Sequence, residues 1–255
     1  MADLIALSVV TSLGNCGGLQ VPLRAGRIDA TEAGPFGVPE PETSLEETLD
    51  EFANSGFNAS DAIGLTACGH SLGRVHHGGF PQVVPESAVT PYNTAGGIDL
   101  DNTRDNFDIN VVHEYLGNYG QRGGPLVTSD NATVRSDLRL YESDQNQTME
   151  ALGQSTEYFF ATCKDLFERM INTVPKEVGL TDVIHPIAVK PVNVSFDITS
   201  GGCLTLSGSI RVSLCQRLVI RVKTNSLTVL DFHRSDGSLF NHGQSKHSTC
   251  FARHW

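Results

Sequence analysis

The spacing of apolar residues along the chain changes from a helical to an alternating pattern. Between residues 157 and 172, apolar side chains recur every three or four positions, which predicts the buried face of a helix. After about Pro186, apolar and polar residues alternate, as in strands that bury one face. The pattern predicts a mainly α domain over residues 1–180, a linker near 175–190, a small antiparallel β domain over 190–240 and a polar tail over 241–255.

Start signals predict the first helices of the α domain. The opening segment MADLIALSVVTSLG lacks the basic start and the cleavage site of a signal peptide, so it is interpreted as a buried helix. Ser44 and Glu47 form a capping-box pattern at the start of a second helix. Either Asn58 or Ser60 can cap a third helix, which leads to His70.

The rest of the chain divides into further helices, loops and strands. A helix is expected from about Asp105 to Leu116, and Pro175 lies just beyond the helix over 157–172. The Gly- and Pro-rich stretches 15–42 and 78–100 are expected to be loops. In the β domain, Gly201-Gly202 provides a turn, and the segments LVIRV and LTVLDF continue the alternation. Cys203 and Cys215 can close a hairpin there, although the sequence does not fix their pairing.

Charge and hydropathy exclude two classes of partner. The chain has 255 residues, 39% of them apolar, which is enough for a sizeable core. Its net charge of −11 argues against nucleic acid, because no basic stripe offsets repulsion from phosphates. No run of about 18 apolar residues occurs, so no membrane-spanning helix is expected.

Cysteines and glycosylation sequons favour an extracellular setting. The six cysteines form no CxxC pair, which argues against a zinc site. Four N-x-[ST] sequons begin at Asn58, Asn131, Asn146 and Asn193. The even cysteine count, the sequons and the acidic charge together predict a secreted glycoprotein with disulfide bonds.

Three short segments carry the candidate chemistry. His70 ends an apolar run, between Gly69 and Ser71; the acidic segment DNTRDNFD covers 101–108, and RSD covers 135–137. Together they resemble the haem peroxidases of the plant, fungal and bacterial superfamily, and most closely the secreted fungal class II-like enzymes. The resemblance covers roughly residues 2–190. It implies the proximal half of an all-helical haem peroxidase domain, with haem b as cofactor and hydrogen peroxide and a small organic reductant as substrates.

The resemblance gives His70 the role of axial haem ligand. Asp137, in VRSDL, then holds the second nitrogen of the imidazole, which fixes the tautomer and makes the ring electron-rich. Asp144, in ESD, is a rival for this role, but the order of segments favours Asp137. Arg74 occupies a place where the family often carries a basic residue near a haem propionate; an ordinary surface arginine is an equal alternative. A lone histidine near a helix end more often has a structural role. For His70, the two other matching segments favour the role of haem ligand.

The same resemblance predicts a calcium site. The pattern D-x-T-x-x-x-F-D over 101–108 is similar to the proximal calcium loop of fungal peroxidases. It implies oxygen ligands from the following residues: Ser71, Asp101, Thr103, Asn106 through its carbonyl, and Asp108. The alternative is a solvated acidic turn, which is the usual role of such clusters.

Other segments bear on activity. Residues 15–30 resemble the family's loop beside the haem edge, through Pro22 and the stretch from Arg24 to Asp29. No segment R-x-x-F-H, which in the family supplies the distal histidine and arginine, occurs in the sequence. The chain is therefore expected to be a family member truncated at its N-terminus, with the distal half missing and activity weak or absent.

Two departures from the family narrow the choice of donor. His76 stands where manganese-oxidising relatives carry an acidic residue, and the only tryptophan is Trp255, in the tail. A phenol-like donor is the remaining expectation, and the protein is expected to be a monomer. The alternative is a non-catalytic, calcium-binding secreted glycoprotein fragment whose β domain makes surface contacts.

Overall fold

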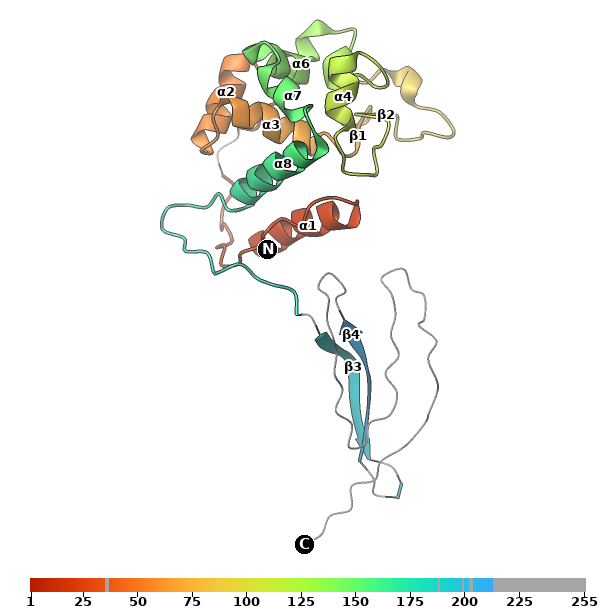
Figure 1. The fold of residues 1–255 in the computed structure, drawn as a ribbon. Helices are drawn as coiled ribbons and strands as arrows, with labels where there is room; N and C mark the ends of the chain where they lie inside the picture. Colours follow the sequence, from red (N-terminus) through yellow and green to blue (C-terminus); the bar gives the residue numbers. More distant parts are fainter. Residues whose placement is uncertain (35–36, 188, 199, 202–203, 213–255) are drawn as a thin grey trace. The chain divides into compact units, whose positions relative to one another are not determined.

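The structure, a computed structural model, describes residues 1–34, 37–187, 189–198, 200–201 and 204–212. The chain divides into two compact units, Met1–Ile184 and His185–Trp255. Helices dominate the first unit, whereas the described part of the second is a two-stranded antiparallel sheet (Figure 1). The prediction of a mainly α fold followed by antiparallel strands is therefore confirmed.

The first unit contains eight α-helices, three short 3₁₀ helices and one two-stranded sheet among its described residues. In chain order they are α1 (Ala2–Asn15), α2 (Leu45–Asn54), α3 (Ala59–Gly69), β1 (Arg74–His76), η1 (Glu86–Ala88), β2 (Gly97–Asp99), α4 (Asn110–Gly117), α5 (Pro125–Thr128), η2 (Ala132–Val134), α6 (Ser136–Tyr141), η3 (Glu142–Asp144), α7 (Gln147–Leu152) and α8 (Thr156–Ile171). Strands β1 and β2 pair antiparallel, with Val75 opposite Ile98.

Two helices begin where the capping signals predict. The Ser44 hydroxyl accepts a hydrogen bond from the Glu47 N–H at 3.2 Å, and the Glu47 carboxylate accepts one from the Ser44 N–H at 3.3 Å. Asn58, rather than Ser60, caps α3, and forms a second capping box with Asp61. Both boxes satisfy N–H groups that have no partner within the helix.

Two predictions about helices are wrong. The helix expected from Asp105 begins at Asn110, because Asp108 accepts a hydrogen bond from the Asn110 N–H and the residues before it fold into turns. The opening helix is present, but it is buried along one side only. Leu4 and Ile5 are each 61% exposed, while Ala6 and Leu13 reach the core.

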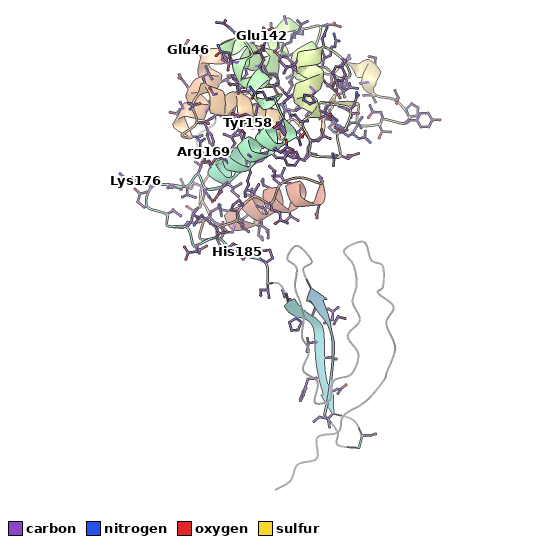
Figure 2. The ribbon with its side chains drawn as sticks, viewed as in Figure 1. Glu46, Glu142, Tyr158, Arg169, Lys176 and His185 are labelled. Atoms are coloured by element: carbon purple, nitrogen blue, oxygen red, sulfur yellow. A yellow bond between two sulfur atoms is a disulfide. The ribbon has the colours of Figure 1, made fainter. Side chains whose placement is uncertain are left out.

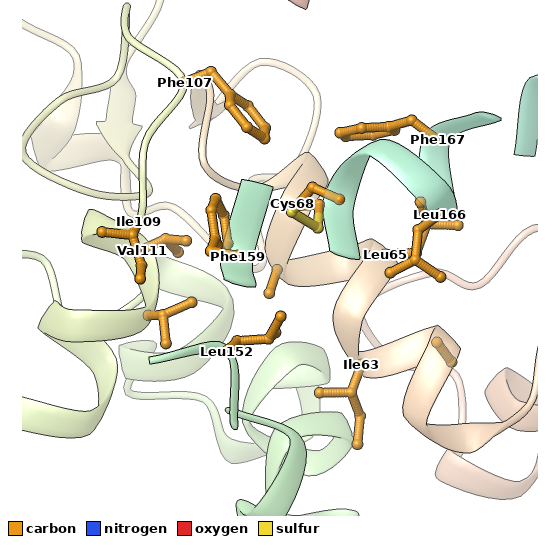
Figure 3. Close-up of a cluster of buried hydrophobic side chains, with 14 of the residues drawn as sticks. Ile63, Leu65, Cys68, Phe107, Ile109, Val111, Leu152, Phe159, Leu166 and Phe167 are labelled. Carbon is orange, nitrogen blue, oxygen red and sulfur yellow. A yellow bond between two sulfur atoms is a disulfide. The ribbon is translucent and has the colours of Figure 1, made fainter. Parts of the chain in front are cut away.

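Helix α3 lies at the centre of the first unit, in contact with α2, α6, α7 and α8 (Figure 1). Ala62, Ile63 and Ala67 have no exposed surface, as expected for a helix covered on most sides. A cluster of aromatic rings packs around its C-terminal half, with the rings of Phe107 and Phe159 5.6 Å apart (Figure 3). This packing fixes the end of α3, which leads directly into His70.

A disulfide between Cys68 and Cys163 joins α3 to α8, with a Cα–Cα distance of 5.5 Å. The sequence left the pairing of the cysteines open. Both residues face the core, since each lies on the apolar side of its helix. Among the described cysteines, Cys16 is free.

The second unit is described through β3 (Val189–Ile198) and β4 (Leu204–Val212), which pair antiparallel. The register shifts between Val192 and Ser195, where Asn193 adopts a φ of 52°. The strands expected beyond residue 212, the pairing of Cys203 with Cys215 and the tail over 241–255 lie outside the described residues. Within the described residues, no helix combines the length and apolar character needed to cross a bilayer.

Candidate active site

His70 is held at the C-terminal end of α3 by its backbone and its side chain. Its N–H donates to the Thr66 carbonyl at 2.8 Å, and its Nδ1 lies 2.5 Å from Oδ2 of Asp137 at the start of α6. Asp137 is almost fully buried, and its second carboxylate oxygen accepts a hydrogen bond from the Ser136 hydroxyl at 3.1 Å. The contact between α3 and α6 therefore brings together the two residues that the resemblance pairs.

The electrostatics of this pair leave one imidazole nitrogen for a ligand. Burial opposes a positive charge on His70, but the negative charge of Asp137 and the hydrogen bond between them outweigh it and raise the His70 pKa. With Nδ1 engaged by Asp137, the Nε2 atom makes no hydrogen bond to any described residue. An imidazole oriented by a carboxylate in this way is a good donor to a metal ion.

His70 and Asp137 line a cavity of about 640 Å³. Most of its wall is apolar, with side chains from α2, α3, α5, α6 and the chain between α3 and α4: Phe52, Leu65, Leu72, Val75, Phe80, Leu100, Leu126 and Leu140. A large apolar cavity with a few polar groups is the usual form of a cofactor site. The donor set fits haem, because a flat apolar macrocycle needs apolar walls and a single histidine on the iron.

Of the other residues considered for this site, two line the cavity and one has other partners. Arg74 lines the cavity, but its guanidinium is bonded to Asp99 at 2.7 Å and to the Gly97 carbonyl at 3.2 Å. His76 lines the same cavity. Asp144, the rival of Asp137, instead accepts hydrogen bonds from the N–H and the hydroxyl of Thr148. The structure therefore brings Asp137, and not Asp144, to His70.

The residues predicted for calcium form a second cluster, directly after His70. The Ser71 hydroxyl donates to the Asp108 carbonyl at 2.9 Å. The Thr103 hydroxyl lies 3.1 Å from Oδ1 of Asp108 and 3.2 Å from Oδ1 of Asp101. Asn106 lies in the same turn, where its amide group donates to Asp108 at 2.8 Å. Ser71 and Asp101 are fully buried, so the cluster is partly closed to solvent.

One atom of this cluster fits a bound cation. The Oδ2 atom of Asp101 is buried and has no hydrogen-bond partner among the described residues. Burial, helped by the charges of Asp108 and Glu114, raises the Asp101 pKa to about 6. Such an oxygen suits a hard cation, which binds carboxylate, hydroxyl and carbonyl oxygens. The described residues contain no group of three or more His, Cys, Asp or Glu side chains placed to hold a metal, so hydroxyl and carbonyl oxygens are needed to complete this set.

Sequence reasoning missed two buried residues near these clusters. Glu114 accepts hydrogen bonds from the Asn102 N–H at 3.0 Å and the Gln121 N–H at 2.7 Å, and so fixes the loop that begins at Asp101. Tyr141 is fully buried one helical turn after Asp137. The spacing of four residues is a signal for Tyr141, since residues four apart share a helix face.

A family model described as peroxidase matches residues 1–155 of the chain. The chain belongs to the haem peroxidase superfamily. The matched region includes His70, Asp137 and the loop over 101–108, and it ends just before α8.

Similar proteins come from fungi and plants. A WSC domain-containing protein of Arthroderma benhamiae is 38% identical over 241 residues, which are 93% of this chain and 32% of that protein. Peroxidase 36 of Arabidopsis thaliana is 34% identical over 133 residues, which are 51% of this chain and 34% of that protein. Cytosolic L-ascorbate peroxidase 2 of the same plant is 34% identical over 93 residues, 35% of each protein. The matches thus span about a third of each of these relatives.

Proposed function

We propose that this chain is the haem-binding and calcium-binding part of a peroxidase that oxidises small, phenol-like donors with hydrogen peroxide. The observation that carries the proposal is the His70–Asp137 pair in the wall of an apolar cavity. The family match supports the reaction class. The Cys68–Cys163 disulfide supports a secreted protein, because such bonds persist in oxidising compartments.

Each residue of the cavity has a defined task in this proposal. His70 binds the iron through Nε2, and Asp137 accepts the Nδ1 proton and keeps the ring oriented. The apolar wall excludes water from the side of the ring system that His70 occupies, and Arg74, which lines the cavity, provides positive charge for an acidic edge of the cofactor. When bound, haem b supplies the redox chemistry that reduces peroxide to water.

Haem titration tests the two roles separately. The unaltered chain is expected to bind haem with the absorption spectrum of a histidine-ligated iron. His70→Ala is expected to lose that spectrum, because it removes the imidazole that Asp137 orients. Asp137→Asn is expected to keep it with about 10- to 100-fold weaker affinity, the usual cost of losing a partner behind a metal ligand. His76→Ala is the matched control, since His76 lines the cavity without bonding Asp137. An unchanged spectrum in His70→Ala would overturn the assignment.

Calcium is expected to stabilise the chain through Asp101. A ligand that binds the folded state alone adds about 2.7 kcal/mol at a concentration 100 times its Kd. For a protein of this size that raises the melting temperature by about 5 to 10 °C. Asp101→Asn is expected to abolish the rise, because it removes the buried charge that faces the cation.

Thermal melts with and without millimolar calcium measure this effect. Asp105→Asn is the control, because Asp105 belongs to the same loop and its side chain is 87% exposed. If calcium raised the melting temperature of the Asp101→Asn variant equally, or did not raise that of the unaltered chain, the solvated acidic turn would be favoured instead.

A further inference from the structure

Unusual backbone conformations gather around one pocket of the first unit. Five described residues other than glycine have a positive φ: Asn118, Arg122, Gln145, Asn146 and Asn193. Three of the five, Asn118, Arg122 and Asn146, line a pocket of about 410 Å³ beside α4, α5 and α6, here called the outer pocket. Residues other than glycine rarely adopt this conformation, and those that do are concentrated at functional sites. The outer pocket is therefore a candidate for a second binding site.

Arg122 has a backbone conformation that would suit glycine better. Its φ is 55°, in a turn where the three glycines of residues 120–124 also have a positive φ. Glycine adopts this conformation without steric cost, whereas arginine gains nothing from it. The Arg122 N–H donates to the Tyr119 carbonyl at 3.0 Å, and the Gln121 N–H donates to buried Glu114 at 2.7 Å. The fold thus holds an arginine in a conformation of low preference, which points to a use for its guanidinium.

The two arginines of the outer pocket have no acidic partner. Neither Arg122 nor Arg135 forms an ion pair with a described residue, although the chain has a net charge of −11. The Nε atom of Arg135 donates to the Ser129 carbonyl at 2.5 Å, and its two terminal nitrogens make no hydrogen bond to a described residue. Guanidinium groups bind carboxylates through paired, charge-assisted hydrogen bonds. The two arginines can therefore hold a carboxylate.

The rest of the outer pocket suits an aromatic ring with a hydroxyl group. Glu142, at the surface of the first unit, also lines the pocket (Figure 2). Arg135 precedes α6 and Glu142 follows it, so their backbones lie about 10 Å apart at 1.5 Å per helical residue. Apolar groups of Tyr115, Val127 and Leu138 line the pocket as well. The Glu142 carboxylate repels an acid but accepts a hydrogen bond from a hydroxyl, so the two ends of the pocket favour different groups.

Asn146 helps to keep this pocket open. The Tyr115 hydroxyl donates to Oδ1 of Asn146 at 2.7 Å, which leaves the Asn146 amide nitrogen as a donor. Asn146 begins one of the four sequons, but its residue is half-buried, whereas Asn58, Asn131 and Asn193 are exposed. Of the four asparagines, Asn146 therefore has the least room for a glycan.

We propose that the outer pocket binds a small aromatic hydroxy acid. The carboxylate of the ligand accepts hydrogen bonds from Arg122 and Arg135, its ring packs on the apolar side chains, and its hydroxyl donates to Glu142. No residue that lines the outer pocket also lines the haem cavity, so the two sites are separate. The inference goes beyond the proposed function, because this site needs no cofactor.

Calorimetric titration with four probes tests the chemistry of the site, in the chain with and without haem b. The compound 4-hydroxybenzoate is expected to bind both forms equally. Its methyl ester, which lacks the negative charge, and benzoate, which lacks the hydroxyl, are each expected to bind about tenfold more weakly, because each loses a charge-assisted hydrogen bond. Inorganic phosphate is expected to bind more weakly still, because it has no ring.

Three variants test the residues. Arg122→Gly is expected to melt at no lower temperature, since glycine suits the positive φ, and yet to bind 4-hydroxybenzoate about tenfold more weakly. Arg135→Gln is expected to show a similar loss. Glu142→Ala is expected to weaken 4-hydroxybenzoate about tenfold without weakening benzoate, because only the former donates to Glu142. Lys176→Gln is the control, because it removes a positive charge from an exposed loop far from Glu142 (Figure 2).

Each contrary result overturns the inference. They are the absence of saturable binding, an unchanged affinity in Arg122→Gly, and equally tight binding of phosphate, which would mark a simple anion site. Loss of binding when haem is present would place the ligand in the haem cavity instead. A chain that binds no haem overturns the proposed function alone, because the titrations without haem still test the outer pocket.

Discussion

The haem-reconstituted chain is expected to oxidise a phenolic dye with hydrogen peroxide at a rate close to that of free haem. His70 and Asp137 set the electron density at the iron, but neither delivers a proton to the bound peroxide. In the family, that task belongs to the histidine of the R-x-x-F-H segment, and its arginine stabilises the developing charge. The 255 residues contain no such segment. General acid–base help is worth about 10² to 10⁴ in rate, and loss of the arginine adds to the deficit.

Initial rates of dye oxidation measure this expectation. The unaltered chain, the His70→Ala variant and free haem are compared at equal haem concentration, with hydrogen peroxide and then with a peracid. With the peracid, the rate of dye oxidation by the chain is expected to come closer to that of a peroxidase that has the distal histidine and arginine. The reason is that the leaving group of a peracid departs without protonation. Fast turnover with hydrogen peroxide that depends on His70 would mean that another residue of this chain transfers the proton.

Local signals in the sequence predicted most of the helical frame. The Ser44–Glu47 box and the cap at Asn58 depend on residues three apart, so the sequence displays both partners together. The last helix follows from periodicity, and the structure places it over Thr156–Ile171. The pairing of His70 with Asp137 spans 67 residues. Periodicity does not reveal such a pair, and the prediction depended on the resemblance.

Features that depend on long-range packing were missed. The opening segment was interpreted as a buried helix, but the sequence did not show which side of it is covered, and Leu4 and Ile5 are exposed. The start of α4 was placed too early because Asp108 bonds both Thr103 and the Asn110 N–H, a competition that helix propensity does not describe. Tyr141 was missed because no helix was predicted over Ser136–Tyr141, the segment that buries it one turn after Asp137.

Removal of the Cys68–Cys163 disulfide is expected to lower the free energy of unfolding by about 4 to 5 kcal/mol in the chain-entropy model. The bond closes a loop of 95 residues, which restricts the unfolded chain strongly. It also joins the C-terminal end of α3 to α8, two residues before His70, so its loss loosens the backbone that positions the imidazole. The double variant Cys68→Ala with Cys163→Ala is therefore expected to unfold at lower denaturant concentration and to bind haem more weakly.

Urea unfolding and haem titration of the double variant separate these two effects. Cys16→Ala is the control, because Cys16 is a free thiol at the end of α1 that makes no disulfide among the described cysteines, and a change within about 0.5 kcal/mol is expected. If only restriction of the unfolded chain matters, haem affinity at low urea stays unchanged while the unfolding midpoint falls. If the bond also fixes the end of α3, haem affinity falls under conditions where the chain is still folded, and calcium bound at Ser71 and Asp101 restores part of it. Equal stability of the double variant and the unaltered chain would contradict the prediction, since a buried bridge between two core helices would then contribute nothing.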